Sequence, residues 1–240
     1  MPNVRPESAL SRFTFKPSRL RHSVLAVLLG VQCAVFAASF DDARTAANVG
    51  DASGLSRIIQ SGIQADSRDD HGNSLLILAA REGQLASVEV LLKAGAALDY
   101  RNPAGDSALM LAVLGGHEAV AKRLIAAGAA VNHDGWTPLH YAAFEGRTAL
   151  LEQLIAAGAE VNARAPNQAT TLMLAARNGH AAVVRVLLQL KQTDLNALND
   201  AGLSADAWAL QNRNTDIAGL IAAERQRRGL PEPALQLIID

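Results

Sequence analysis

Apolar positions recur along most of this chain in short runs at helical spacing, with small residues between the runs. A helix is expected to begin after Thr137, a good N-cap, with Pro138 in its first turn and Gly146 at its end. A second helix is expected over Thr148–Ala157, and Gly158 follows it. The apolar stripes of these two helices consist of Leu139, Ala142 and Ala143, and of Leu150, Leu151, Leu154 and Ile155.

The same pattern returns with a period of about 33 residues. One column of glycines has steps of 33, 33, 30 and 33, at Gly50, Gly83, Gly116, Gly146 and Gly179. One more step reaches Asn212, and Asn is the next best residue after Gly for a left-handed helix-ending position. Two further columns keep the register, at Gly62, Gly95, Gly128 and Gly158, and at Asp66, Asp99, Asn132, Asn162 and Asn196. A pair of short helices cannot bury its apolar faces alone, so the copies are expected to stack into one elongated core.

The N-terminal segment follows another pattern. Residues 1–22 carry five basic residues and one acidic residue, and the stretch Ser23–Phe40 carries no charge. This order predicts a secretory signal peptide over residues 1–37, with cleavage after Ala37, where Val35 and Ala37 satisfy the small-residue rule. The alternative is an uncleaved inner-membrane signal anchor, although the apolar run is shorter than the roughly 20 residues of a full span.

Composition and charge exclude several classes of protein. Aromatic residues are only 4% of the chain, and its apolar half is mainly Ala and Leu, which favours closely packed helices over a β-sandwich. Without residues 1–37, the chain has 17 basic and 22 acidic residues, a balance that disfavours nucleic acid and anionic membranes as partners. The single cysteine, Cys33, lies in the predicted signal, so neither a disulfide framework nor a thiolate zinc site is expected.

The repeat resembles the ankyrin repeat over roughly residues 39–228. The best match is the TPLHxAA sequence of Thr137–Ala143, followed by Gly146 and by the Gly158–Asn162 segment. The resemblance implies an all-α repeat, an ankyrin solenoid of helix-turn-helix units with short β-hairpin or loop fingers. We expect a repeat domain over 38–228, with capping units 39–69 and 200–228 around four full units at 70–100, 103–132, 133–162 and 165–197.

Three features depart from the repeat pattern near the C-terminus. The fourth unit has Leu190-Lys191 in place of its second glycine, and the last unit has Asp206 where a leucine belongs, as a polar capping repeat would. A C-terminal tail, 229–240, begins with the breaker Gly229–Pro233 and ends in the apolar run Leu235–Ile239. We expect the tail to fold back over the last helix pair; the alternative is a docking peptide.

The motifs give no indication of catalysis. The chain contains no Gly-x-Ser-x-Gly elbow, phosphate-binding loop or His-Glu-x-x-His sequence. Three of its histidines, His117, His140 and His180, occupy repeat positions where an imidazole usually ties neighbouring backbone together. His71 and His133, near repeat tips, look free of such a role. We therefore expect a monomer that is not an enzyme, with no cofactor and no metal site.

The resemblance similarly implies protein binding through the finger tips and the exposed side of the first helices, on the concave face of the stack. Six aromatic residues lie outside the signal, and three of them, Trp136, Tyr141 and Phe144, fall at such contact positions. Trp, Tyr and Arg are enriched at interface hot spots. The predicted partner-binding residues are Trp136, Tyr141, Phe144, Leu111, Leu114, Arg81, Arg177, Leu174 and His133. The alternative is that the leucines, or Trp136 itself, simply pack between repeats.

The finger before Trp136 is expected to be truncated. Only two residues separate Asn132 from Gly135, three fewer than the period requires. The shorter finger would leave a notch able to admit a partner loop, or it is a neutral deletion, since loops tolerate changes of length.

These patterns together predict a non-enzymatic interaction module that binds a protein partner as an adaptor or inhibitor. Alanine richness combined with an export signal suggests a Gram-negative bacterium with a high-GC genome, and hence the periplasm. The alternatives are a secreted effector acting on host proteins and an accessory factor that protects an exported enzyme.

The predicted signal peptide is testable by sequencing the N-terminus of the exported product. We expect a full chain with a C-terminal tag, expressed in a Gram-negative host, to yield a product that begins at Ala38. A product that keeps residues 1–37 and sediments with the inner membrane would instead identify a signal anchor.

Overall fold

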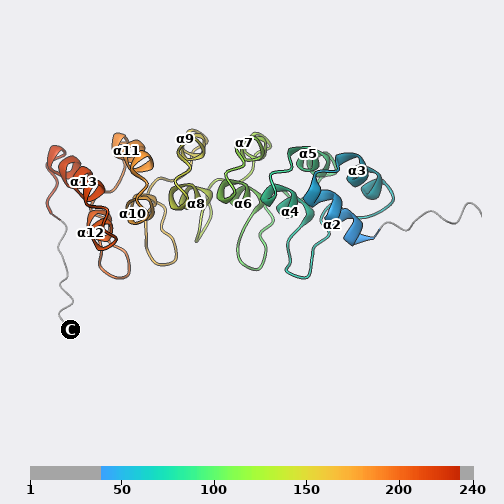
Figure 1. Ribbon diagram of the computed structural model, residues 1–240, viewed down its shortest axis with the longest axis horizontal. Helices are drawn as coiled ribbons and strands as arrows, with labels where there is room; N and C mark the ends of the chain where they lie inside the picture. Colours follow the sequence, from blue (N-terminus) through green and yellow to red (C-terminus); the bar gives the residue numbers. More distant parts are fainter. Residues whose placement is uncertain (1–38, 233–240) are drawn as a thin grey trace, which may run out of the picture. The chain divides into compact units, whose positions relative to one another are not determined.

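The computed structural model describes residues 39–232, which fold into helices without any extended strand. The predicted signal peptide and the apolar run Leu235–Ile239 lie outside the described residues. Within that range, every helix is too short or too polar to cross a membrane. The helices, labelled as in Figure 1, are α2 (Phe40–Val49), α3 (Ala52–Gln60), α4 (Leu75–Arg81), α5 (Leu85–Lys93), α6 (Ala108–Leu114), α7 (Glu118–Ala126), α8 (Pro138–Phe144), α9 (Thr148–Ala156), α10 (Thr171–Arg177), α11 (Ala181–Gln189), α12 (Ala205–Gln211) and α13 (Thr215–Arg227).

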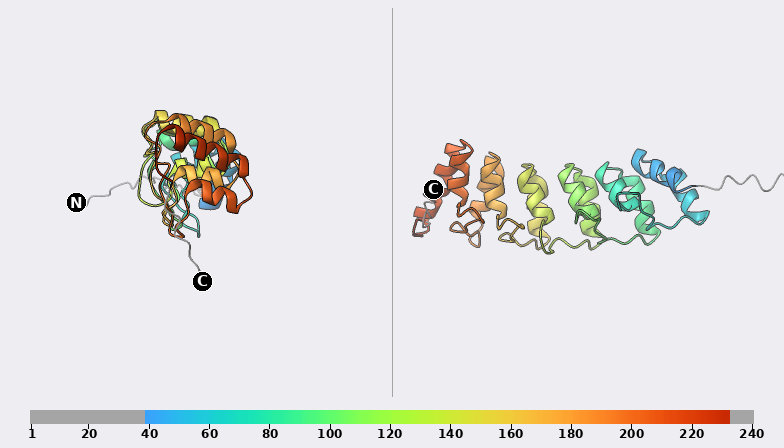
Figure 2. Two further views of the ribbon diagram at one scale, coloured as in Figure 1. Left: turned by 90° about the vertical axis from the view of Figure 1, so that its left-hand side faces the viewer. Right: turned by 90° about the horizontal axis from the view of Figure 1, so that it is seen from below.

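The helices form antiparallel pairs that stack in chain order. Figure 1 shows one row of first helices, α2, α4, α6, α8, α10 and α12, and a second row formed by the odd-numbered helices. Loops, which we call fingers, project from the row of first helices, and Figure 2 shows the same layers from the end and from below. This arrangement confirms the expected all-α ankyrin-like solenoid.

Polar caps and glycines bound the helices as the sequence predicts. The hydroxyl oxygens of Ser74, Ser107, Thr137 and Thr170 each accept a hydrogen bond from a backbone N–H in the first turn of the helix that follows. The predicted helix after Thr137 is α8, and the predicted Thr148–Ala157 helix ends one residue earlier, at Ala156. Both short helices of this unit therefore form where the apolar stripes place them.

Close packing between neighbouring pairs explains the recurrent Gly-x and Gly-His dipeptides. A Cβ at Gly83 would lie 2.5 Å from Nδ1 of His117, and a Cβ at Gly146 would lie 2.5 Å from Nδ1 of His180. Both glycines also have left-handed φ angles, so two separate constraints exclude a side chain there. The imidazoles that occupy this space bind the preceding unit: His117 Nε2 lies 2.9 Å from the carbonyl oxygen of Arg81, and His180 Nε2 lies 2.8 Å from that of Phe144.

The column of Asp and Asn residues makes a second set of bonds between units. One side-chain oxygen of each of the first four residues in this column accepts a hydrogen bond of 2.7–3.0 Å from a backbone N–H in the next unit. The pairs are Asp66 with Ala97, Asp99 with Ala130, Asn132 with Glu160, and Asn162 with Asp194. Polar contacts thus fix the spacing of units whose apolar faces supply the stacking energy.

The expectation that Asn212 takes the left-handed position is wrong. Asn212 has φ −96°, and Arg213 has φ 67° instead. The cause is one extra residue in the loop after α11: Asn162 bonds to Asp194, a step one residue longer than from Asp66 to Ala97. Every later position is therefore displaced by one.

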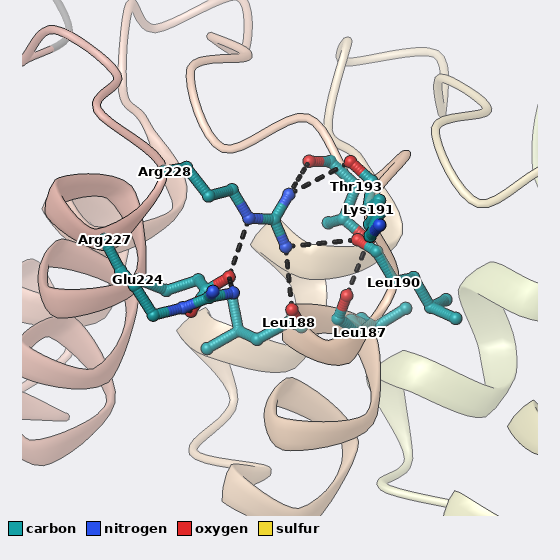
Figure 3. Close-up of polar contacts among 8 residues, drawn as sticks. All are labelled: Leu187, Leu188, Leu190, Lys191, Thr193, Glu224, Arg227 and Arg228. Atoms are coloured by element: carbon teal, nitrogen blue, oxygen red, sulfur yellow. Dashed lines mark hydrogen bonds and ion pairs between the residues drawn. The ribbon is translucent and has the colours of Figure 1, made fainter.

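The end of α11 lacks the glycine that follows the second helix of the earlier units. The residue after the helix, Leu190, is extended, so the last carbonyls of α11 need partners from elsewhere. Arg228 supplies them: its guanidinium donates to the carbonyl oxygens of Leu188 (2.7 Å) and Leu190 (3.1 Å), and also to those of Lys191 and Thr193 (Figure 3). The Nε of Arg228 donates a hydrogen bond of 2.7 Å to Oε1 of Glu224, which orients the guanidinium. Hydrogen bonds from Arg227 and Arg228 lower the pKa of Glu224 to about 2.

A buried ion pair joins the two helices of the last unit. The Arg225 side chain has no exposed surface, and it donates two hydrogen bonds of 2.7 Å to the two carboxylate oxygens of Asp206. It also donates to Asn196 and to the carbonyl oxygen of Leu195, and its Nη1 lies 3.4 Å from a carboxylate oxygen of Glu232. Burial alone would raise the pKa of the Asp206 carboxyl, but hydrogen bonds from Arg225 and Ser204 outweigh burial and hold that pKa below its usual value. Asp206 thus replaces the expected leucine because it neutralises Arg225.

We predict that Arg225→Met lowers the free energy of unfolding by about 3 kcal/mol, because it leaves the Asp206 carboxylate without its partner. Urea unfolding of the full chain measures the loss. Arg227→Met is the matched control: Arg227 lies two residues away, is 72% exposed and should change stability little. Since the pKa of Asp206 is lowered by folding, the contribution of the pair should disappear as pH falls below about 4. Equal effects of the two substitutions would contradict this assignment.

Candidate partner-binding surface

The third finger is shortened at its tip, and its base keeps the register of the others. The residues between the Asp/Asn column and the next N-cap are 67–73, 100–106, 163–169 and 197–203 in four fingers, but only 133–136 in the third. Gly135, at φ 84°, matches the left-handed residues Gly72, Gly105, Gln168 and Gly202 of the other fingers. Trp136 therefore occupies the position held by Asp106 in the preceding finger. Figure 1 shows the loop before α8 as the shortest of the projecting loops.

The long and short fingers are held differently. In the first finger, the Asp69 carboxylate accepts hydrogen bonds from the backbone N–H groups of His71 and Asn73, which closes the tip as an Asx turn. Asn102 and Asn199 play related parts in the second and fifth fingers. In the third finger, the carbonyl oxygen of Asp134 accepts a hydrogen bond of 3.3 Å from Nη1 of Arg101, and the carbonyl oxygen of Leu198 in the full-length fifth finger accepts the equivalent bond from Arg164. The arginine contact between neighbouring fingers is thus a feature of the repeat, whereas the Asx turn belongs to long fingers.

Trp136 is the centre of an aromatic cluster that α8 builds. Its ring centroid lies 5.5 Å from that of Tyr141 and 6.3 Å from that of Phe144, the latter edge to face. The edge-to-face ring of His140 lies 5.8 Å away. Trp136, Tyr141 and Phe144 each stay partly exposed, whereas His140 is buried and binds the carbonyl oxygen of Ala163 through Nε2. The structure therefore brings the three predicted aromatic residues together, and we call them the aromatic patch.

The hydroxyl group of Tyr141 ties this patch to the preceding unit. It donates a hydrogen bond of 2.8 Å to Oδ1 of Asp106. Burial raises the pKa of Tyr141 well above its ordinary value, and the hydrogen bond and charge of Asp106 raise it further. The phenol is accordingly a fixed donor that orients both Tyr141 and the Asp106 carboxylate.

The predicted leucines have another role. Leu174 is 1% exposed and Leu111 8% exposed, so both belong to the core, which is the alternative that the sequence left open. They stand at the repeat position of Tyr141, where an aliphatic side chain fits entirely between helix pairs. Leu114, at the repeat position of Phe144, is partly exposed and borders the patch.

The remaining predicted residues lie apart from the rings. Arg81 is exposed and its Nε lies 2.9 Å from a carboxylate oxygen of Glu82. The Arg177 guanidinium lies 5.0 Å from the ring centroid of Trp208, a residue that the sequence reasoning missed. Trp208 occupies the Tyr141 position of the last unit, but the extra residue after α11 hides this equivalence in a strict 33-residue alignment. His133, in the short finger, has its pKa lowered mainly by burial.

Comparisons with known proteins agree with this architecture. The family profile described as "Ankyrin repeats (3 copies)" matches residues 76–165 and 147–227. A chain of the solved structure "Bd0816 Predatory Endopeptidase from Bdellovibrio bacteriovorus in complex with immunity protein Bd3460" is 29% identical, with a TM-score of 0.68. The similarity covers 76% of this chain and 97% of that chain. A comparison with curated proteins gives no match.

We predict that Tyr141→Phe lowers the free energy of unfolding by about 1 kcal/mol at neutral pH, because it removes the hydrogen bond to Asp106. Folding raises the pKa of this phenol, so the wild-type advantage is complete below the unfolded-state value near 10 and is lost as pH rises above it. Urea unfolding of both proteins at neutral and alkaline pH tests this. A difference that is independent of pH would disprove the assignment.

Proposed function

Since this chain belongs to the ankyrin-repeat family, we propose that it is a non-enzymatic, exported protein that binds a protein partner through its fingers and first helices. Ankyrin repeats form interaction modules, and the described helix pairs present a continuous finger side for that purpose. The observation that carries the proposal is the aromatic patch. Three partly exposed rings meet on one unit of a chain that is only 4% aromatic.

The position of the patch favours recognition over a purely structural role. The repeat positions of Trp136 and Tyr141 hold Ala169 and Leu174 in the following unit, and those residues are 0% and 1% exposed. The fold thus accommodates small or aliphatic residues at both positions without any exposed ring. Partly exposed aromatic side chains are the groups that contribute most to protein interfaces, which supports a hot spot at this unit.

The comparison structure supports one kind of partner more than others. Its printed description pairs an immunity protein with an endopeptidase, and the similarity covers nearly all of the matched chain. We therefore favour an exported hydrolase, which this protein would inhibit or protect, over a host protein bound by a secreted effector. The predicted signal peptide over residues 1–37 supports export, and we propose the periplasm as the destination.

Affinity capture with the full, C-terminally tagged chain tests the proposed surface. We expect Trp136→Ala, alone or with Tyr141→Ala, to weaken capture of the partner by at least about tenfold, because truncation of a central aromatic anchor costs about 2 kcal/mol. Mass spectrometry identifies the captured protein, and cell fractionation locates both proteins.

A matched control separates binding from stability. Leu210→Ala removes a 55% exposed side chain from α12, in the last unit, and should leave capture unchanged. Circular dichroism confirms that each variant is folded. If the Trp136 and Tyr141 variants capture the same partners as the wild type, the aromatic patch is not the binding surface. Recovery from the culture medium, not the periplasm, would favour the effector role.

A further inference from the structure

The missing tip of the third finger leaves a gap between two complete fingers. The tips on either side, in 100–106 and 163–169, end in the exposed residues Pro103, Ala104, Pro166 and Asn167. Between them the third finger has no tip residues, and its left-handed Gly135 leads directly to Trp136. We call this position the finger gap. A partner segment that enters the finger gap reaches the aromatic patch without competing with a tip of this chain.

Two carboxylates flank the aromatic patch without a cationic partner in the described residues. Asp106 uses Oδ1 to accept from the Tyr141 hydroxyl, and within residues 39–232 its Oδ2 has no hydrogen bond. Glu145, the C-cap residue that directly follows α8, lies four residues after Tyr141, and its carboxylate forms neither an ion pair nor a hydrogen bond in that range. Both groups therefore retain acceptor capacity beside the rings.

Two neighbouring arginines direct their guanidinium groups at other partners. Arg101 donates to the carbonyl oxygens of Gly105 and Asp134, and so directs its guanidinium at backbone. Arg177 stacks over Trp208 in the next unit. In the described residues, neither guanidinium forms an ion pair with Asp106 or Glu145.

We propose that the finger gap admits a loop of the protein partner and that this loop places an arginine side chain against the aromatic patch, between Asp106 and Glu145. This inference rests on the proposed binding function and specifies its chemistry. An aromatic face attracts a cation, and the planar guanidinium both stacks on rings and matches a carboxylate with two donors. Lysine satisfies the charge but not the stacking, so arginine is the preferred residue.

A small probe tests the chemistry without the partner. The full chain is titrated with N-acetylarginine N-methylamide while the indole N–H resonances of Trp136 and Trp208 are followed by NMR. We expect a saturable shift of the Trp136 resonance at millimolar concentrations, with little change at Trp208. The uncharged analogue N-acetylnorleucine N-methylamide should shift Trp136 much less, and the lysine analogue should bind more weakly than the arginine probe.

Two variants distinguish the effect of the two carboxylate charges from the effect of the open finger gap. Asp106→Asn with Glu145→Gln keeps an acceptor for Tyr141 but removes both charges, and it should weaken the arginine probe about tenfold. Insertion of Asn-Pro-Ala, the sequence of residues 102–104, after His133 restores a full-length finger and should block capture of the partner. Asp70→Asn with Glu152→Gln removes two exposed charges elsewhere and is the matched control.

The outcomes distinguish this inference from the binding function itself. Equal shifts of Trp136 with the arginine and norleucine probes, or no shift with either, would overturn the arginine site. Undiminished capture by both the finger-extended protein and the Asp106→Asn, Glu145→Gln protein would also overturn it. If Trp136→Ala still abolished capture in that case, the proposed binding surface would stand while its cationic specificity would not.

Discussion

Every helix pair in this protein has an apolar face that only the adjacent pair can cover. The buried Ala and Leu positions are therefore shared between units, and no unit has a core of its own. Because the contact is made by small side chains, the spacing is tight enough for polar groups to bridge it. The Asp and Asn column and the imidazoles of His117 and His180 exploit this spacing and fix the register of the stack.

The surface chemistry follows from that arrangement. The positions of Trp136 and Tyr141 are enclosed in the following unit, where they hold Ala169 and Leu174. The aromatic residues at these positions of the third unit stay partly exposed. Tyr141 also takes its hydrogen-bond acceptor, Asp106, from the unit before it. A deletion and three substitutions are thus enough to turn a repeating surface into a distinct one.

Sequence periodicity predicted most of the fold because each element depends on local signals. Caps such as Thr137, glycines such as Gly146 and the apolar stripes define the helices without reference to the rest of the chain. The failures have non-local causes. The position of Arg213 depended on one inserted residue, and the burial of Leu111 and Leu174 depended on how closely the pairs approach. Nothing in the pattern indicated that Arg225 and Asp206 would meet, since they lie 19 residues apart on two different helices, α13 and α12.

The hydrogen bonds from Arg228 to the end of α11 limit which repeat units of this protein can be exchanged for one another. In the earlier units a glycine follows the second helix, at Gly62, Gly95, Gly128 and Gly158. An exchange between those units therefore leaves each second helix with its own C-terminal glycine. The fourth unit and the last unit form a matched pair. A crossover between them would leave either a helix end without its guanidinium donor or an Arg228 guanidinium with Glu224 as its remaining partner. Replacement of either unit alone would therefore break these hydrogen bonds, whereas replacement of an upstream unit would leave them in place.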